Sequence, residues 1–123
     1  SAISGLYQGY FDMTYFALVP PTLKRRGLKL AIVFNYDDFR FEVWLSGRNR
    51  KIQTECWKQL KDGRWDGYRI VTPARGVDSI VECDLAVELD LSHPAGLTAR
   101  IEKGTKTFTE AIERFLAKNR SVR

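Results

Sequence analysis

Two runs of alternating apolar residues, separated by a polar turn, constrain the fold of this chain more than any other feature. Every second residue is large and apolar in Leu28–Phe34, and the same period of two returns in Phe39–Leu45. Side chains two positions apart share one face of a strand, and the segment between the runs, Asn35–Asp38, is rich in residues that tolerate turn dihedrals. The pattern predicts a β-hairpin. Its second strand would carry Phe39, Phe41, Val43 and Leu45 on one face and Arg40, Glu42 and Trp44 on the other.

Length and composition indicate one domain. The 123 residues, 44% of them hydrophobic, are enough to bury a single core. Apolar runs such as Ala31–Phe34 are far shorter than the ~20 residues of a membrane-spanning helix, and Ser1–Gly5 lacks the basic and apolar regions of a secretory signal. The two cysteines, Cys56 and Cys83, are too few for a disulfide scaffold and are interpreted as reduced core residues. We therefore expect one domain over residues 1–123, in the cytoplasm and without membrane contact.

Segments on both sides of the hairpin add further elements. Tyr7–Leu18 is rich in strand-forming residues and is followed by Pro20 and Pro21, which predicts one strand. Residues 48–61 switch to helical spacing, with Ser46 as a candidate N-cap and Gly63 as the stop.

The second half of the chain predicts two more strands and a long helix. The strands are expected at Tyr68–Val71 and Ser79–Val87, separated by Pro73 and Gly76. The helix follows Pro94, with Gly104 as a tolerated flaw or a break. The resulting order, βββαββα, predicts an α+β domain in which an antiparallel or mixed sheet has helices packed mainly on one face.

Positive charge gathers at the start of the first predicted helix. The chain has 20 Lys and Arg against 15 Asp and Glu, a formal charge of +5, which attracts acidic partners without naming one. Arg48–Lys51 begins the helix, where free backbone amides already present positive potential and favour phosphates. This segment is therefore a candidate phosphate or carboxylate site. In the alternative, its two arginines pair with Glu42, Asp37 or Asp38, or point into water.

Two acidic residues in predicted strands need partners, because burying an unpaired carboxylate against a core costs folding free energy. Asp12 and Glu42 could converge with Arg40 on one open face and form an acid and base pair. The simpler interpretation is a structural pairing of Glu42 or Asp12 with Arg40 or Lys29 on a solvated face.

The remaining polar and aromatic residues show no familiar catalytic or cofactor motif. His93 stands alone and the two cysteines lack metal-ligand spacing, so neither a metal site nor a cofactor is expected. Several aromatic residues could stack nucleobases beside the basic cluster, although such residues more often belong to a core. They are Trp44, Trp57, Trp65, Tyr10, Tyr15 and Tyr68.

Three segments resemble an uncharacterised family of small bacterial proteins, a domain of unknown function. They are Tyr7–Phe16 (YQGYFDMTYF), Leu28–Phe34 (LKLAIVF) and Phe39–Lys51 (FRFEVWLSGRNRK), and the likeness continues through residues 76–80 and the helix around Gly104. The resemblance implies kinship without an assigned activity, cofactor or catalytic residue. Relatives carry an additional N-terminal helical segment, so the resemblance implies that a segment that normally covers the sheet is missing here or is supplied by another chain.

Adding such a helix would give αβββαβ, the core order of restriction-endonuclease-like nucleases, which this chain resembles more loosely. Those nucleases use a D/E-x-K triplet on the third strand, where two carboxylates hold a metal and the Lys assists water. Here the triplet is Glu42-Val43-Trp44, with Trp in the place of Lys, and the second strand has no acid before Asp37. The departure argues against an active nuclease and leaves Asp12, Arg40 and Glu42 as weak catalytic candidates.

The leading hypothesis is a non-catalytic module that binds an anionic ligand, either nucleic acid, an acidic protein or a small phosphate or carboxylate compound. Its expected binding residues are Arg48, Asn49, Arg50, Lys51 and Trp44. The alternatives are a degenerate nuclease-like hydrolase and a subunit that self-associates through an uncovered sheet face.

Overall fold

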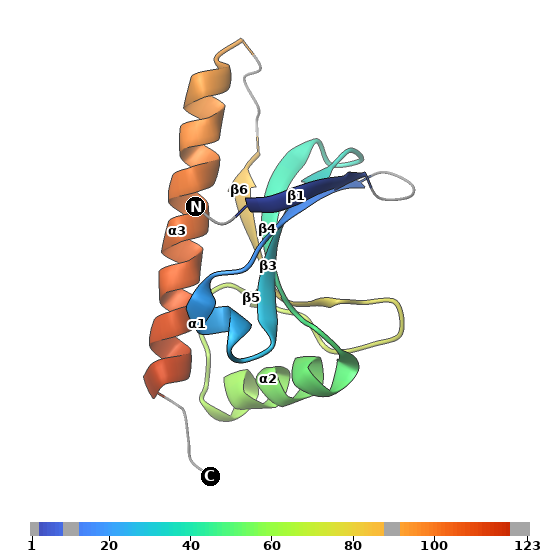
Figure 1. The fold of residues 1–123 in the computed structure, drawn as a ribbon, viewed down its shortest axis with the longest axis vertical. Helices are drawn as coiled ribbons and strands as arrows, with labels where there is room; N and C mark the ends of the chain where they lie inside the picture. The colour runs from blue at the N-terminus through green and yellow to red at the C-terminus, as the bar shows by residue number, and fades with distance from the viewer. Residues whose placement is uncertain (1–2, 9–12, 88–91, 119–123) are drawn as a thin grey trace.

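The computed structural model describes residues 3–8, 13–87 and 92–118. One six-stranded sheet, in the order β1-β2-β3-β4-β6-β5, forms its centre, and every pair of neighbouring strands is antiparallel (Figure 1). The elements are β1 (Ile3–Gln8), β2 (Met13–Leu18), α1 (Pro21–Lys24), β3 (Leu28–Asn35), β4 (Arg40–Gly47), α2 (Arg50–Asp62), β5 (Arg69–Ile70), β6 (Ser79–Ala86) and α3 (Pro94–Lys118).

The α+β class and the βββαββα order are confirmed, with one strand and one short helix added. From β2 onwards the larger elements follow the predicted order, and α2 and α3 both pack on β4 and β6. A single core joins the apolar face of the sheet to all three helices, with Leu23 from α1, Leu60 from α2 and Phe108 from α3. No helix within the described residues is long and apolar enough to cross a membrane.

The first predicted strand is in fact two strands. Tyr7 and Gln8 end β1 and pair antiparallel with Tyr15 and Thr14 of β2. The aromatic composition is the same on both sides of Gly9, so propensity alone predicts one long strand. Glycine and aspartate are common turn residues, and Gly9 and Asp12 were the available signal for a division.

The predicted β3–β4 hairpin is confirmed, but Phe39 lies outside the strand. Asn35 pairs with Arg40, so residues 36–39 form the turn. Phe39 adopts a φ of 51° and its side chain is 49% exposed, whereas an in-register Phe39 would have faced the core. The backbone amide of Asp38 donates to the side chain of Asn35, which favours the four-residue turn over a longer strand.

The N-cap of helix α2 lies three residues after the predicted one. Asn49, not Ser46, is the N-cap: its backbone is extended and its side chain accepts a hydrogen bond from the amide of Ile52, with a donor–acceptor distance of 2.8 Å. Ser46 is instead a buried residue of β4. Gly63 ends the helix as predicted.

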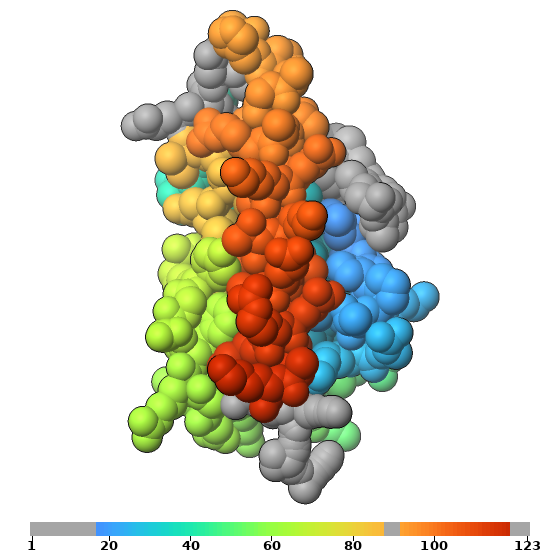
Figure 2. Space-filling view, turned by 90° about the vertical axis from the view of Figure 1, so that its left-hand side faces the viewer, coloured from blue at the N-terminus to red at the C-terminus, as the bar shows by residue number. Residues whose placement is uncertain are grey.

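Helix α3 runs through Gly104 without a break. A Cβ atom at this position would lie 2.7 Å from a methyl group of Leu85 on β6, so the missing side chain lets the helix approach the sheet closely. Figure 2 shows α3 (orange to red) between α2 (yellow-green) and the segment containing the end of β2 and α1 (blue).

Candidate functional site

The basic residues before β3 lie beside the start of α2. Leu28 pairs with Gly47 at the open end of the hairpin, and the amide of Arg48 donates to the carbonyl of Gly27 at 2.9 Å. Gly27 has a φ of 75°, a conformation that glycine adopts without strain. This contact brings the basic turn Lys24–Arg26 next to Arg48–Lys51, although the two segments are far apart in the sequence.

A cavity of about 320 Å³ opens between β3, the end of β4 and the start of α2, and the turn Lys24–Arg26 is not part of its lining. We call it the basic cavity. Its charged residues are three cations and one acid, and its other lining residues are polar or glycine. The full set is Lys29, Ser46, Gly47, Arg48, Asn49, Arg50, Gln53 and Asp78.

Neutral groups hold Arg50 in place. Its Nη1 atom donates to Oε1 of Gln53 at 2.8 Å and to the carbonyl of Val77 at 3.3 Å. The Gln53 side chain is only 4% exposed, and its Nε2 atom donates to the same Val77 carbonyl at 2.9 Å. The guanidinium is therefore oriented without a partner that cancels its charge.

Arg48, Lys29 and Lys51 are exposed. None of the ion pairs within the described residues involves any of them. Within the described residues, neither Arg48 nor Arg50 forms the alternative ion pair with Glu42, Asp37 or Asp38. Positive charge accumulates here, and a nearby acid, Asp78, forms no ion pair with it.

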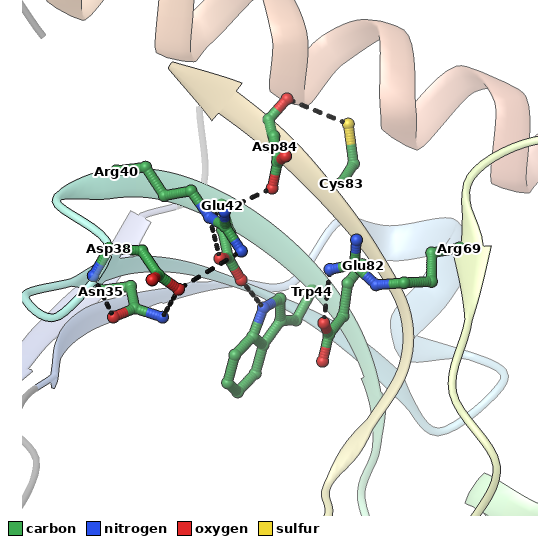
Figure 3. Close-up of polar contacts among 9 residues, drawn as sticks. All are labelled: Asn35, Asp38, Arg40, Glu42, Trp44, Arg69, Glu82, Cys83 and Asp84. Atoms are coloured by element: carbon green, nitrogen blue, oxygen red, sulfur yellow. Dashed lines mark hydrogen bonds and ion pairs between the residues drawn. The ribbon is translucent and has the colours of Figure 1, made fainter. Parts of the chain in front are cut away.

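Trp44 does not line the basic cavity. Its indole Nε1 donates to Oε1 of Glu42 at 2.8 Å, so this end of its ring faces the carboxylate (Figure 3). The predicted grouping of Trp44 with Arg48–Lys51 therefore does not appear in the lining of the cavity.

Glu42 is the most deeply buried charged residue of the described sheet, with 2% exposure. Besides Trp44, its partner is Arg40, whose Nε atom donates to Oε2 at 2.6 Å. Arg40 also lies 3.4 Å from Asp84 and 3.6 Å from Asp38 (Figure 3). The hydrogen bond to Glu42 raises the pKa of Arg40, with smaller contributions from the charges of the neighbouring acids. This is the structural pairing of Glu42 with Arg40 that the simpler interpretation expects.

A second ion pair lies beside this cluster at the edge of the sheet. Arg69 donates to Glu82 at 2.8 Å, and the Ser79 hydroxyl donates to the other oxygen of the same carboxylate at 2.5 Å. The described residues contain no group of three or more acidic, cysteine or histidine side chains that could hold a metal ion. Asp12, the remaining weak catalytic candidate, lies outside the described residues, so its convergence with Glu42 stays a prediction.

The cysteines and two of the aromatic candidates belong to the interior. Burial raises the pKa of the Cys56 thiol to about 12, and it also raises the pKa of the half-buried Cys83 thiol. Trp65 packs edge-on against Phe115, while Tyr68 packs on Phe108. Trp65 and Tyr68 are therefore core contacts, as the alternative to base stacking expects.

Sequence reasoning missed Lys29 and Gln53 as parts of the basic cavity. Lys29 pairs with Ser46 across the hairpin, whereas the predicted turn at residues 35–38 would place it opposite Trp44, two residues further from the start of α2. No pattern in the sequence pointed to Gln53, because its partner Val77 lies in a loop whose position depends on β6.

Replacing Gly47 with alanine should lower the free energy of unfolding by about 2 kcal/mol. The new Cβ atom would lie 2.8 Å from the backbone nitrogen and 3.1 Å from the Cα atom of Gln53, so α2 must shift. Gly96→Ala is the matched control, since a Cβ there meets nothing closer than 3.9 Å and alanine favours a helix. Urea unfolding measures both; an equal change in the two variants would contradict close packing at Gly47.

A family model for the Domain of unknown function (DUF7000) matches residues 1–116. The fold and the two charged clusters are thus those of one member of an uncharacterised domain family. This chain belongs to that family, which confirms the expected membership in an uncharacterised domain family. No curated protein and no solved structure matches the chain.

Proposed function

We propose that this protein is a binding module for an anionic, phosphate- or carboxylate-bearing ligand, which it contacts in the basic cavity. The observation that carries the proposal is the lining of this cavity, where Lys29 of β3 comes together with Arg48 and Arg50 at the start of α2. Lys29, Arg48 and Arg50 would supply the charge, and Asn49 would hold the helix start in position. Lys51 would extend the positive surface along α2.

Preorganisation supports this proposal over a solvated charged surface. Arg50 is held by Gln53 and Val77, so less side-chain freedom is lost when it binds a ligand. Arginine also presents a planar set of donors that matches phosphate and carboxylate oxygens. We further propose a cytoplasmic location, which agrees with two unpaired cysteines, and a bacterial origin, which rests on the family resemblance alone.

Binding of labelled nucleic acid should weaken steeply with salt, because each phosphate contact releases counterions. We expect Lys29→Gln with Arg48→Gln to reduce the slope of log affinity against log salt concentration by about 2. Fluorescence anisotropy of fluorescein-labelled single-stranded DNA, RNA and duplex DNA measures this slope. Competition with inorganic tripolyphosphate extends the test to a small anion.

The matched control removes two charges elsewhere. Lys58 on α2 and Lys103 on α3 are both exposed and lie outside the basic cavity. Lys58→Gln with Lys103→Gln leaves the same net charge as the first variant and should leave the slope nearly unchanged. Equal effects of the two double variants, or no binding of any of these anions, would refute the proposal.

A further inference from the structure

A second, larger cavity lies between α3 and the end of β2. It has a volume of about 680 Å³, within the roughly 300–1,000 Å³ of typical small-molecule sites. We call it the α3 groove. One wall comes from Leu18, Pro20, Pro21 and Ile32, and the other from a stripe of α3: Glu102, Thr105, Lys106, Thr109, Glu110 and Glu113.

The α3 wall uses a helix face different from the one that builds the core. Its six residues follow helical spacing from 102 to 113, a length of roughly 16 Å. Only Thr105 of this set is buried, at 6% exposure, whereas the buried apolar residues Phe108, Ile112 and Leu116 point into the core. The groove is therefore apolar on the sheet side and polar along the helix.

Charge in the α3 groove is opposite in sign to that of the protein. Three glutamates face one lysine there, on a chain with a formal charge of +5. Although Lys106 stands four residues from both Glu102 and Glu110, no ion pair within the described residues joins it to either. Glu113 accepts a hydrogen bond from the hydroxyl of Thr22. The rim of the groove thus favours a positively charged group.

Thr105 adds a second observation. Its hydroxyl oxygen is buried and has no hydrogen-bond partner within the described residues, which is unfavourable for a polar atom. Thr109, one turn later, donates to the carbonyl of Thr105 at 2.7 Å. Thr105 makes no equivalent contact, which leaves an unpaired polar atom in the lining of the groove.

We propose that the α3 groove binds a small organic cation with an apolar body, such as an alkylamine. The apolar part would lie against Leu18, Ile32 and the two prolines, and the ammonium group would lie at the rim beside either Glu102 or Glu110, which are about two turns apart on α3. The Thr105 hydroxyl, after rotation about χ1, would be an additional partner. This site is separate from the basic cavity and does not depend on the anionic ligand proposed above.

Three probes of equal chain length test the charge preference: octylamine, 1-octanol and sodium octanoate. Titration of the full chain, followed by amide chemical shifts in ¹⁵N spectra, should give shifts along residues 102–113 and around Leu18. Octylammonium should bind about tenfold more tightly than octanoate, because the carboxylates of Glu102 and Glu110 attract the ammonium group and repel the carboxylate of octanoate. Shifts elsewhere, or no preference for the amine, would overturn the proposal.

Two variants separate the charged rim from the apolar wall. Glu102→Gln with Glu110→Gln should reduce the preference for octylammonium over octanoate to about threefold or less, while 1-octanol binds as before. Glu55→Gln with Asp62→Asn removes two exposed acids of α2 and should leave the preference intact. Thr109→Trp should fill the groove and weaken all three probes more than tenfold; unchanged binding would place the probes elsewhere.

A second copy of the chain is the rival occupant of the groove. Sedimentation equilibrium of the wild-type chain and of Thr109→Trp distinguishes a small-molecule occupant from a second copy of the chain. A monomer in both agrees with a small-molecule site. A wild-type dimer that Thr109→Trp converts to monomer would overturn the proposal and support self-association through this surface.

Discussion

Replacing Arg40 with alanine should lower the free energy of unfolding by about 3 kcal/mol, because the change leaves a buried charge without its cation. Glu42 is 2% exposed, and Arg40 donates to it at 2.6 Å. The indole of Trp44 would remain as a neutral donor at 2.8 Å, which cannot cancel the charge. Urea unfolding at pH 7 measures the loss.

Arg69→Ala is the matched control for this experiment. Arg69 forms an ion pair of similar length with Glu82, but its side chain is 51% exposed, so the expected loss is below about 1 kcal/mol. The double variant Arg40→Ala with Glu42→Gln should recover part of the loss, since no buried charge remains. Equal losses for Arg40→Ala and Arg69→Ala would show that burial of Glu42 does not determine the effect.

The alternation of apolar residues predicted the hairpin at the centre of the fold and the residues that share each face, because a period of two fixes the two faces of a strand. The same alternation placed Arg40, Glu42 and Trp44 on one face, and two of these side chains do contact the third. Asp84 could not be predicted as a neighbour of Arg40, because it comes from β6 and the order of strands in a sheet cannot be deduced from the local alternation of apolar residues.

Two local errors have different physical causes. Ser46 and Asn49 are both good N-cap residues, and the choice between them depends on how far β4 continues beside β3 and β6, which is a tertiary effect. Phe39 continues the apolar alternation but lies in the turn, because the Asn35 side chain organises that turn through a contact only three residues away. The local pattern therefore loses to a contact with other strands in the first case and to a side-chain contact within the turn in the second.

The basic cavity was predictable in part. The run Arg48–Lys51 identified the start of α2 as positively charged, whereas Lys29 comes opposite Ser46 only in the observed register of the hairpin. The approach of Gly27 to Arg48 follows from the same register, since Leu28 pairs with Gly47. The α3 groove had no signal in the sequence, because its two walls meet only when α3 packs across the sheet.

Replacing Phe108 with alanine should lower the free energy of unfolding by about 3–5 kcal/mol. Phe108 is fully buried and is the largest such side chain of the described residues, and it joins α3 to the sheet and to Tyr68, with ring centroids 5.1 Å apart. A domain of this size has only about 5–15 kcal/mol of stability, so the melting temperature should fall by on the order of 15 °C. Differential scanning calorimetry measures the fall.

Phe39→Ala removes the same side chain from a different environment and separates the effect of burial from that of side-chain size. The Phe39 ring is 49% exposed and contacts Phe34 edge-on, with centroids 5.5 Å apart, so its loss leaves no internal cavity. We expect a change below about 1 kcal/mol. If both variants lost the same stability, α3 would not be held to the sheet by Phe108, and the α3 groove, which needs that packing, would lose its second wall.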